Sequence, residues 1–192
     1  MIDHELAERV AAKLGALAPD EVAVPDGVVP SPALSQLIAQ YPALQLRLEV
    51  FDRIVDVAAE GFDLDVRVGD EIAPHLIARH LADNHRVRCA APAYVQRRGS
   101  PRTLDELAAH DCLVIKERDH PFGVWKLRCG ADEQTVKVTG PLSANNGEMA
   151  VQWAVDGHGI VLRSLWDVGV HLQAGRLVPV LPPWQQEANV WA

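Results

Sequence analysis

The eight histidines are the residues whose number first suggests a metal site. Three of them, His75, His80 and His85, recur at a spacing of five residues. On a helix this spacing turns each ring by about 500° from the one before, so three such rings cannot share one face or one ion. We therefore expect scattered surface or partly packed histidines, with no bound metal and no cofactor.

Asp63 and Asp65 are the candidates for acid–base chemistry, because alternate residues of a strand lie on the same face. A pair of carboxylates on one face could exchange a proton with a substrate. Alternatively, such a pair is solvated and borders a sheet edge. The sequence contains none of the motifs HExxH, GxSxG, GxxxxGK[ST] and GxGxxG, which prepare zinc, serine, phosphate and dinucleotide chemistry. We expect a protein that is not an enzyme.

The three cysteines, Cys89, Cys112 and Cys129, are odd in number and far apart in the sequence. A disulfide framework or a zinc knuckle needs paired or closely spaced cysteines. We expect three reduced thiols that serve as packing residues.

Composition and charge limit the class of protein. The chain has 192 residues, of which 48% are hydrophobic and 23% charged, enough for a core in one domain or two small lobes. A formal net charge of -8 argues against direct binding of nucleic acid, since such surfaces are basic. No apolar stretch is long enough for a membrane helix, and the N-terminus MIDHELAERV lacks the pattern of a signal peptide. We expect a cytoplasmic protein with no membrane partner.

The stretch GFDLDVRVGD (residues 61–70) alternates apolar and charged residues, which is typical of a strand with one packed face and one polar face. It ends at Gly69-Asp70. A glycine at a strand end allows a simple turn, or it allows a ligand to approach the main chain closely. The residues alone leave both interpretations open.

Helix and strand patterns alternate along the rest of the chain. We expect helices over residues 4–17, 31–41, 53–60, 92–99, 103–110, 145–157 and 165–172. We expect further strands over residues 43–50, 87–91, 112–116, 124–128, 135–139, 159–162, 177–181 and 189–192. The alternation indicates an α/β architecture with helices packed on a mostly parallel sheet.

Three helix starts carry capping signals. Ser31 stands before a proline and is a candidate N-cap. Thr103 with Glu106, and Asn145 with Glu148, have the spacing of a capping box. These signals predict where the helices begin.

The order of the motifs resembles the effector-binding domain of LysR-type transcriptional regulators from about residue 22 to the C-terminus. The resemblance is carried by YPALQLRLEV, then DRIVDVAAEGFDLDVRVGD, then LIARHLADNHRVRCAAPAYVQRRGSPRTLDELAAHDCLV, Trp125, Asn145-Asn146-Gly147-Glu148, GHGIVL and GRLVPVLPPW. It implies two α/β lobes of the periplasmic-binding-protein type (type 2), joined by two crossing strands, with a small effector held between the lobes.

The resemblance also implies domain bounds. Residues 1–18 would be a remnant of the family's linker helix, residues 19–87 with 162–192 would form lobe one, and residues 88–161 would form lobe two. The crossing strands would fall near residues 86–91 and 159–163. Gly69 would then end a lobe-one strand at the edge where open α/β sheets bind ligands.

Eight ligand-binding residues are carried over from the resemblance. They form four candidate walls: the turn and helix start at Asp26 and Ser31, the strand end at Arg67 and Gly69, the helix start at Asn145 and Asn146, and the crossing at Arg163 and Ser164. Because helix N-termini attract anions and an arginine can bind a carboxylate through two hydrogen bonds, we expect a small organic anion as effector. Each asparagine could instead only cap its helix.

The resemblance finally implies partners and rivals. Members of the family read DNA through an N-terminal winged helix-turn-helix, which this sequence lacks, so we expect no direct DNA contact by this chain. We expect a homodimer, because family members pair through lobe one. A free-standing solute-binding protein of the same fold is the alternative, and an enzyme built on the same site would need Asp63, Asp65 and a histidine to converge.

Overall fold

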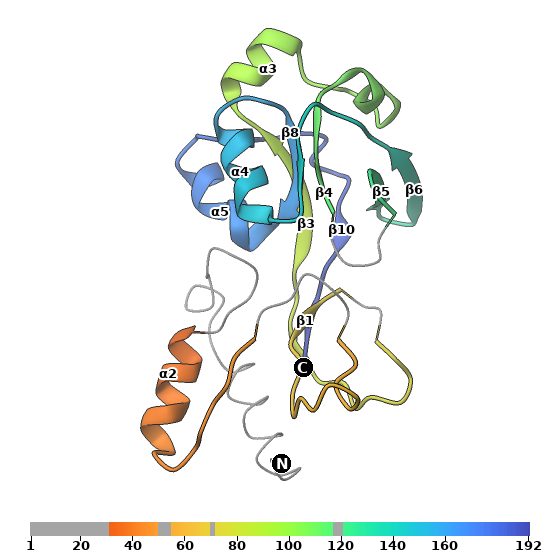
Figure 1. Cartoon of the computed structure of the whole chain (residues 1–192). Helices are drawn as coiled ribbons and strands as arrows, with labels where there is room; N and C mark the ends of the chain where they lie inside the picture. Colours follow the sequence, from red (N-terminus) through yellow and green to blue (C-terminus); the bar gives the residue numbers. More distant parts are fainter. Residues whose placement is uncertain (1–30, 50–54, 70–71, 117–120) are drawn as a thin grey trace. The chain divides into compact units, whose positions relative to one another are not determined.

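A computed structural model describes residues 31–49, 55–69, 72–116 and 121–192 (Figure 1). The contacts divide the chain into unit 1, Met1–Asp83 with Ala188–Ala192, and unit 2, Asn84–Glu187. The expected domain bounds differ from this division, because residues 162–187 belong to unit 2 and not with the first segment of the chain. Each unit is therefore described by itself.

Unit 2 is built on a six-stranded sheet with the order β10-β3-β8-β4-β7, and β9 also pairs with β3. The strands are β3 (His85–Ala90), β4 (Cys112–Ile115), β7 (Ser143–Ala144), β8 (Ile160–Ser164), β9 (Val178–Pro179) and β10 (Gln186–Glu187). β4 runs parallel to β7 and β8, whereas β3 is antiparallel to β8, β9 and β10. The prediction of a mostly parallel sheet is wrong, because a strand buried on both faces has the same apolar pattern in either direction.

The two faces of this sheet bury separate clusters. Alternate residues of the central strands face each cluster, as in Cys112 and Leu113 on β4. One face is covered by α4 (Gly147–Val155) and α5 (Leu165–Gln173). The other cluster is lined by α3 (Pro92–Arg98), the 3-10 helix η1 (Asp105–Ala109) and the hairpin of β5 (Val124–Cys129) and β6 (Asp132–Lys137). Figure 1 shows the hairpin on the side of the sheet opposite α4 and α5, and α3 at the top of the unit.

The capping box expected at Thr103 is not formed. The helix there is a five-residue 3-10 turn whose N-cap position is Leu104, without a side-chain cap. Glu106 accepts a hydrogen bond of 2.8 Å from the backbone N–H of Arg102 instead. The spacing of residues can predict that a helix starts nearby, but when the helix begins one residue later than expected, a different residue occupies the N-cap position.

The described part of unit 1 contains less helix and strand than unit 2. This part contains α2 (Ser31–Gln40) and an antiparallel sheet of β1 (Arg67–Val68), β11 (Val190–Trp191) and β2 (His80–Ala82), in that order. Leu37 is the buried centre of a small cluster that also holds residues Leu34, Tyr41, Leu44, Leu64, Val66 and Leu81. Residues 1–30, over part of which a helix is expected (4–17), lie outside the described residues.

Three expectations in unit 1 are wrong. Residues 43–49 form no strand, residues 57–61 form a turn where a helix was expected over 53–60, and the strand expected over 61–70 is reduced to Arg67–Val68. Arg67 is also buried, although alternation placed it on a polar face. Alternating residues extend into a strand only where a neighbouring strand accepts their hydrogen bonds, and here β11 offers two paired positions.

Within the part of the chain that the structure describes, every helix is too short or too polar to cross a lipid bilayer.

Candidate functional site

The carboxyl ends of β4, β7 and β8 lie together at one edge of the unit 2 sheet, since these strands are parallel neighbours. β7 leads through Asn145 into the first turn of α4, and β8 leads directly into α5. Open α/β sheets bind ligands at such an edge. We call the residues Asn145, Asn146, Gly147, Arg163 and Ser164 the α4 edge.

Asn146 is the N-cap of α4. Its side-chain Oδ1 accepts a hydrogen bond of 2.9 Å from the backbone N–H of Met149, and its backbone is extended, with φ -115° and ψ 121°. The helix start was therefore predicted one residue too early, and the cap is Asn146 and not Asn145. The cap satisfies one of the N–H groups that a first helical turn leaves without a partner.

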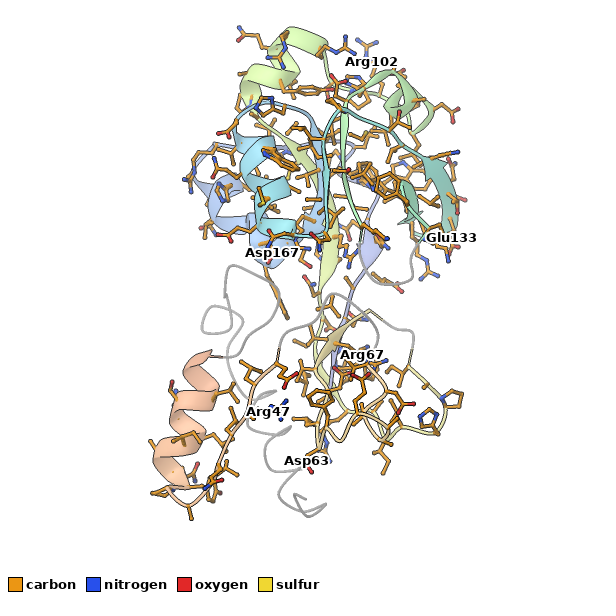
Figure 2. The ribbon with its side chains drawn as sticks, viewed as in Figure 1. Arg47, Asp63, Arg67, Arg102, Glu133 and Asp167 are labelled. Atoms are coloured by element: carbon orange, nitrogen blue, oxygen red, sulfur yellow. The ribbon has the colours of Figure 1, made fainter. Side chains whose placement is uncertain are left out.

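Arg163 lies flat against the first residue of α4. A Cβ atom placed on Gly147 would come closer than 3.0 Å to the guanidinium carbon of Arg163, so no side chain fits there while Arg163 keeps its position. Arg163 Nε also forms an ion pair of 2.6 Å with Asp167 Oδ2, and both side chains are 12% exposed. Figure 2 labels Asp167 at the end of unit 2 where α4 begins.

This arrangement places positive charge where the helix end is already positive. The guanidinium and the dipole of α4 both favour an anion, and Asp167 supplies one from within the chain. The predicted carboxylate partner of Arg163 thus has a competitor in Asp167. Sequence reasoning missed both Gly147 and Asp167, because the ion pair joins the end of strand β8 to the first turn of α5 and does not follow the i,i+4 pattern of a single helix.

Ser164 is buried and bonded. Its Oγ accepts a hydrogen bond of 3.0 Å from Asn84 Nδ2, and the exposed fractions are 8% for Ser164 and 5% for Asn84. Ser164 is also the N-cap residue of α5, yet its side chain does not cap that helix.

In unit 1, Arg67 is paired with Asp65. The distance between Arg67 Nε and Asp65 Oδ2 is 2.8 Å, and Arg67 lies opposite Trp191 in the strand pairing (Figure 2 labels Arg67). Gly69 has φ 114°, a conformation that favours glycine, and its N–H donates to the carbonyl of Asn189 over 2.8 Å. The glycine at this strand end is therefore required by the bend of the main chain.

The eight predicted binding residues fall into separate groups. Asn145, Asn146, Arg163 and Ser164 lie together in unit 2, and Arg67 and Gly69 lie together in unit 1. Ser31 begins α2, but its side chain lies outside the described residues, as does Asp26 entirely. Ligand contact by any of these residues stays a prediction.

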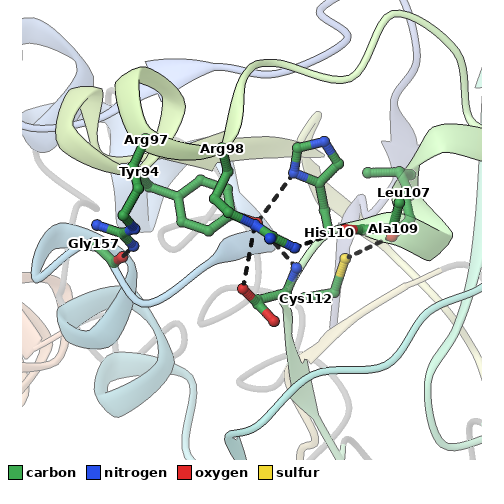
Figure 3. Close-up of polar contacts among 9 residues, drawn as sticks. Tyr94, Arg97, Arg98, Leu107, Ala109, His110, Cys112 and Gly157 are labelled. Carbon is green, nitrogen blue, oxygen red and sulfur yellow. Dashed lines mark hydrogen bonds and ion pairs between the residues drawn. The ribbon is translucent and has the colours of Figure 1, made fainter.

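A second polar cluster ties α3 to the strand β4 (Figure 3). The buried Tyr94 hydroxyl lies 3.1 Å from His110 Nδ1 and accepts a hydrogen bond of 2.9 Å from the Asp111 N–H. Burial raises the pKa of Tyr94 and lowers the pKa of His110, which the Arg98 charge lowers further. Arg97 donates to the Gly157 carbonyl over 2.8 Å and also lies over the Tyr94 ring. These contacts hold α3 against the loop before β4 and against the end of α4.

Arg88 is a fully buried cation in the centre of β3. Its guanidinium donates to the carbonyl oxygens of Val180, Leu181 and Trp184, in the loop before β10. Leu181 has φ 50°, a left-handed conformation that a leucine rarely adopts. Burial lowers the pKa of Arg88 to about 10, so the side chain stays charged at neutral pH. Arg88 fixes this loop in its bent form.

Cys89 and Cys112 are buried packing residues, as predicted. Burial raises the pKa of each thiol to about 12, which leaves both protonated and unreactive at neutral pH. Cys129 is half-buried on β5. Among the described residues there is no group of three histidine, cysteine or acidic side chains that could hold a metal ion.

Comparison with known proteins identifies the family. Residues 22–192 match the family model described as the LysR substrate binding domain. The chain is 56% identical over 164 residues to the HTH-type transcriptional regulator DmlR of Escherichia coli (strain K12), covering 85% of this chain and 53% of DmlR. It is 49% identical over 162 residues to the HTH-type transcriptional activator TtdR of the same strain, covering 84% of this chain and 52% of TtdR. The chain thus spans about half the length of these relatives.

Solved structures agree with the assignment. The regulatory domain of AphB from Vibrio vulnificus matches with a TM-score of 0.70 and 24% identity, covering 84% of this chain and 82% of that one. The LysR-type regulator CrgA from Neisseria meningitidis matches with a TM-score of 0.69 and 26% identity, covering 97% of this chain and 68% of that one. The α/β fold of the periplasmic-binding-protein type is confirmed, and the chain belongs to the LysR substrate-binding domain family as an effector-binding domain.

Proposed function

We propose that this domain senses a small organic anion, and that the α4 edge contacts it. The observation that carries the proposal is the contact of the Arg163 guanidinium with Gly147, which puts a fixed cation beside the first turn of a nine-residue helix. The helix end and the guanidinium favour the same charge. The names of the relatives DmlR and TtdR, both transcriptional regulators, support a sensor in place of a solute-binding protein.

The Asp167 carboxylate limits how the anion could bind. Arg163 Nε faces Asp167, so an incoming carboxylate would compete with Asp167 for the guanidinium. Asn145 is exposed beside it and offers an amide that can donate to an anion. Arg67, paired with Asp65 in unit 1, is a second candidate cation.

The test is a thermal-shift screen of the whole chain against small carboxylates, amino acids and neutral sugars. A ligand present at about 100 times its Kd adds about 2.7 kcal/mol to the free energy of unfolding, which is several degrees for a domain of this size. We expect the shift with carboxylates. The shift should shrink in Asn145→Ala and in the double variant Arg163→Met/Asp167→Leu, which removes both charges together.

The exposed serine at position 143 provides a matched control, since Ser143→Ala changes the same edge without a charge or an amide. It should keep the full shift. A ligand whose shift survives both Asn145→Ala and the double variant would contradict binding at the α4 edge. Shifts given only by neutral sugars would contradict the anionic class.

We further propose that the chain acts in the cytoplasm as a homodimer without catalysis of its own, as part of a protein that binds DNA through another domain. The support is the family and the regulator names of the relatives. Asp65, one of the carboxylates considered for acid–base chemistry, is engaged by Arg67. Sedimentation showing only monomer at high concentration would contradict the dimer.

A further inference from the structure

Where the chain passes from unit 1 into unit 2, a buried hydrogen bond joins Asn84 to Ser164, and the serine could instead bond to another partner. The chain enters unit 2 at Asn84, which lies between β2 and β3, two strands that belong to different sheets. Pairing of β2 with β11 ends at Ala82, and pairing of β3 with β10 begins at His85. Asn84 therefore stands at a break in the strand pairing, and its side chain is bonded to Ser164 over 3.0 Å.

Ser164 is placed so that it could serve a different partner. It occupies the N-cap position of α5 with φ -50° and ψ 137°, a backbone shape in which a serine hydroxyl can reach the N–H groups of the first turn. Serine is among the preferred N-cap residues, yet no side-chain cap is formed. Asp167, at the third position of α5, also gives the spacing of a capping box.

We propose that the Ser164 hydroxyl is a two-position latch. In the position observed, it holds Asn84 at the entrance to unit 2; in the other, it releases Asn84 and caps α5. The change needs only a rotation about the Ser164 side-chain bond, because the backbone already suits the cap. In the capped position an N–H of α5 gains an acceptor but the buried Asn84 amide loses one, so the observed position is the more populated of the two in the absence of an effector.

Such a latch couples the connection between the units to the start of α5. A ligand or a contact that stabilises the capped form of α5 would loosen Asn84, and the reverse also holds. Arg163 and Asp167 lie directly before and within the first turn of α5, so the latch adjoins the α4 edge. Its use in signalling rests on the proposed function, but its existence does not.

The experiment is amide hydrogen exchange, measured residue by residue on the whole chain without any effector. In Asn84→Leu, which keeps the branched shape of the side chain but removes the donor, Ser164 is free to cap. We expect the N–H groups of Trp166 and Asp167 to exchange about fivefold more slowly than in the parent chain, relative to Met149 on α4 as internal reference. Asn84→Ala, which loses volume as well, should slow them in the same direction.

The double variant Asn84→Leu/Ser164→Ala distinguishes the latch from a general change in stability. It lacks the hydroxyl, so the slowing should disappear, whereas Ser143→Ala combined with Asn84→Leu should retain it. Unchanged or faster exchange of the α5 amides in Asn84→Leu would overturn the proposal. Slowing that persists without the Ser164 hydroxyl would overturn it as well. Neither result depends on whether an anion binds.

Discussion

Replacing Gly147 by alanine should test the contact between Arg163 and α4. The new methyl would lie within 3.0 Å of the guanidinium, whereas ordinary contact begins at 3.4 Å. The guanidinium therefore has to move by about 1 Å, which weakens the ion pair with Asp167, and local overpacking of this kind costs about 1–3 kcal/mol. Alanine in place of a helical glycine returns about 0.5–1 kcal/mol. The expected net loss is about 1 kcal/mol.

The same substitution made in a variant without the guanidinium should have the opposite effect on stability. In Arg163→Met/Asp167→Leu the guanidinium is absent, so Gly147→Ala should stabilise the chain by about 0.5–1 kcal/mol through helix propensity. The coupling between the two sites, measured by chemical denaturation of all four proteins, should be about 1.5–2 kcal/mol. In thermal melts the net loss in the parent chain corresponds to about 2–4 °C. Equal effects of Gly147→Ala in both backgrounds would refute the reasoning.

Four further predictions concern buried groups of unit 2. With a thiol reagent at pH 8, Cys129 should react fast and Cys89 and Cys112 only as fast as the chain opens, as counted by mass spectrometry; three fast thiols would contradict their burial. Because the pKa of each buried thiol is raised to about 12, its stabilising effect is complete below the unfolded pKa near 9 and is lost as the pH rises from there to about 12, so urea midpoints should fall across that window. Arg88→Met should lower the free energy of unfolding by about 3 kcal/mol or more, because three buried carbonyl oxygens lose their donor. Amide hydrogen exchange should become faster in the loop that follows β9 and change less in α3. An unchanged urea midpoint would exclude the role given to Arg88. Tyr94→Phe should cost about 1–3 kcal/mol, since the Asp111 N–H loses its acceptor, and a neutral result would mean that another acceptor replaces it.

The sequence predicted unit 2 better than unit 1, and the reason is physical. In unit 2 the central strands β4 and β8 are apolar runs whose residues are mostly buried on both faces, so almost any correct pairing preserves their pattern. In unit 1 the alternating residues 43–49 and 61–66 have few partners, and alternation without a partner strand does not make a strand. Local patterns thus succeeded where tertiary contacts agreed with them.

The site residues show the same limit. The helix start at Asn145-Asn146 was predicted to within one residue, because capping chemistry is local. The partners of the two arginines and of Ser164 were not predicted, although Asp65 and Asp167 are near in sequence. The bond from Ser164 to Asn84 joins residues that are 80 positions apart, and a single sequence carries no signal for such a pair.

The two ends of unit 2 lie next to each other, which makes the unit suitable for transfer into another protein. Unit 2 is one continuous segment, and the strands by which it begins and ends, β3 and β10, are paired antiparallel at His85 and Glu187. A segment whose two ends meet in this way can be exchanged between hosts at little cost, since the host needs only two adjacent strand ends to receive it. Unit 2 therefore has the architecture of an insertion, which could be excised at residues 84 and 187 and grafted into another protein as a self-contained module.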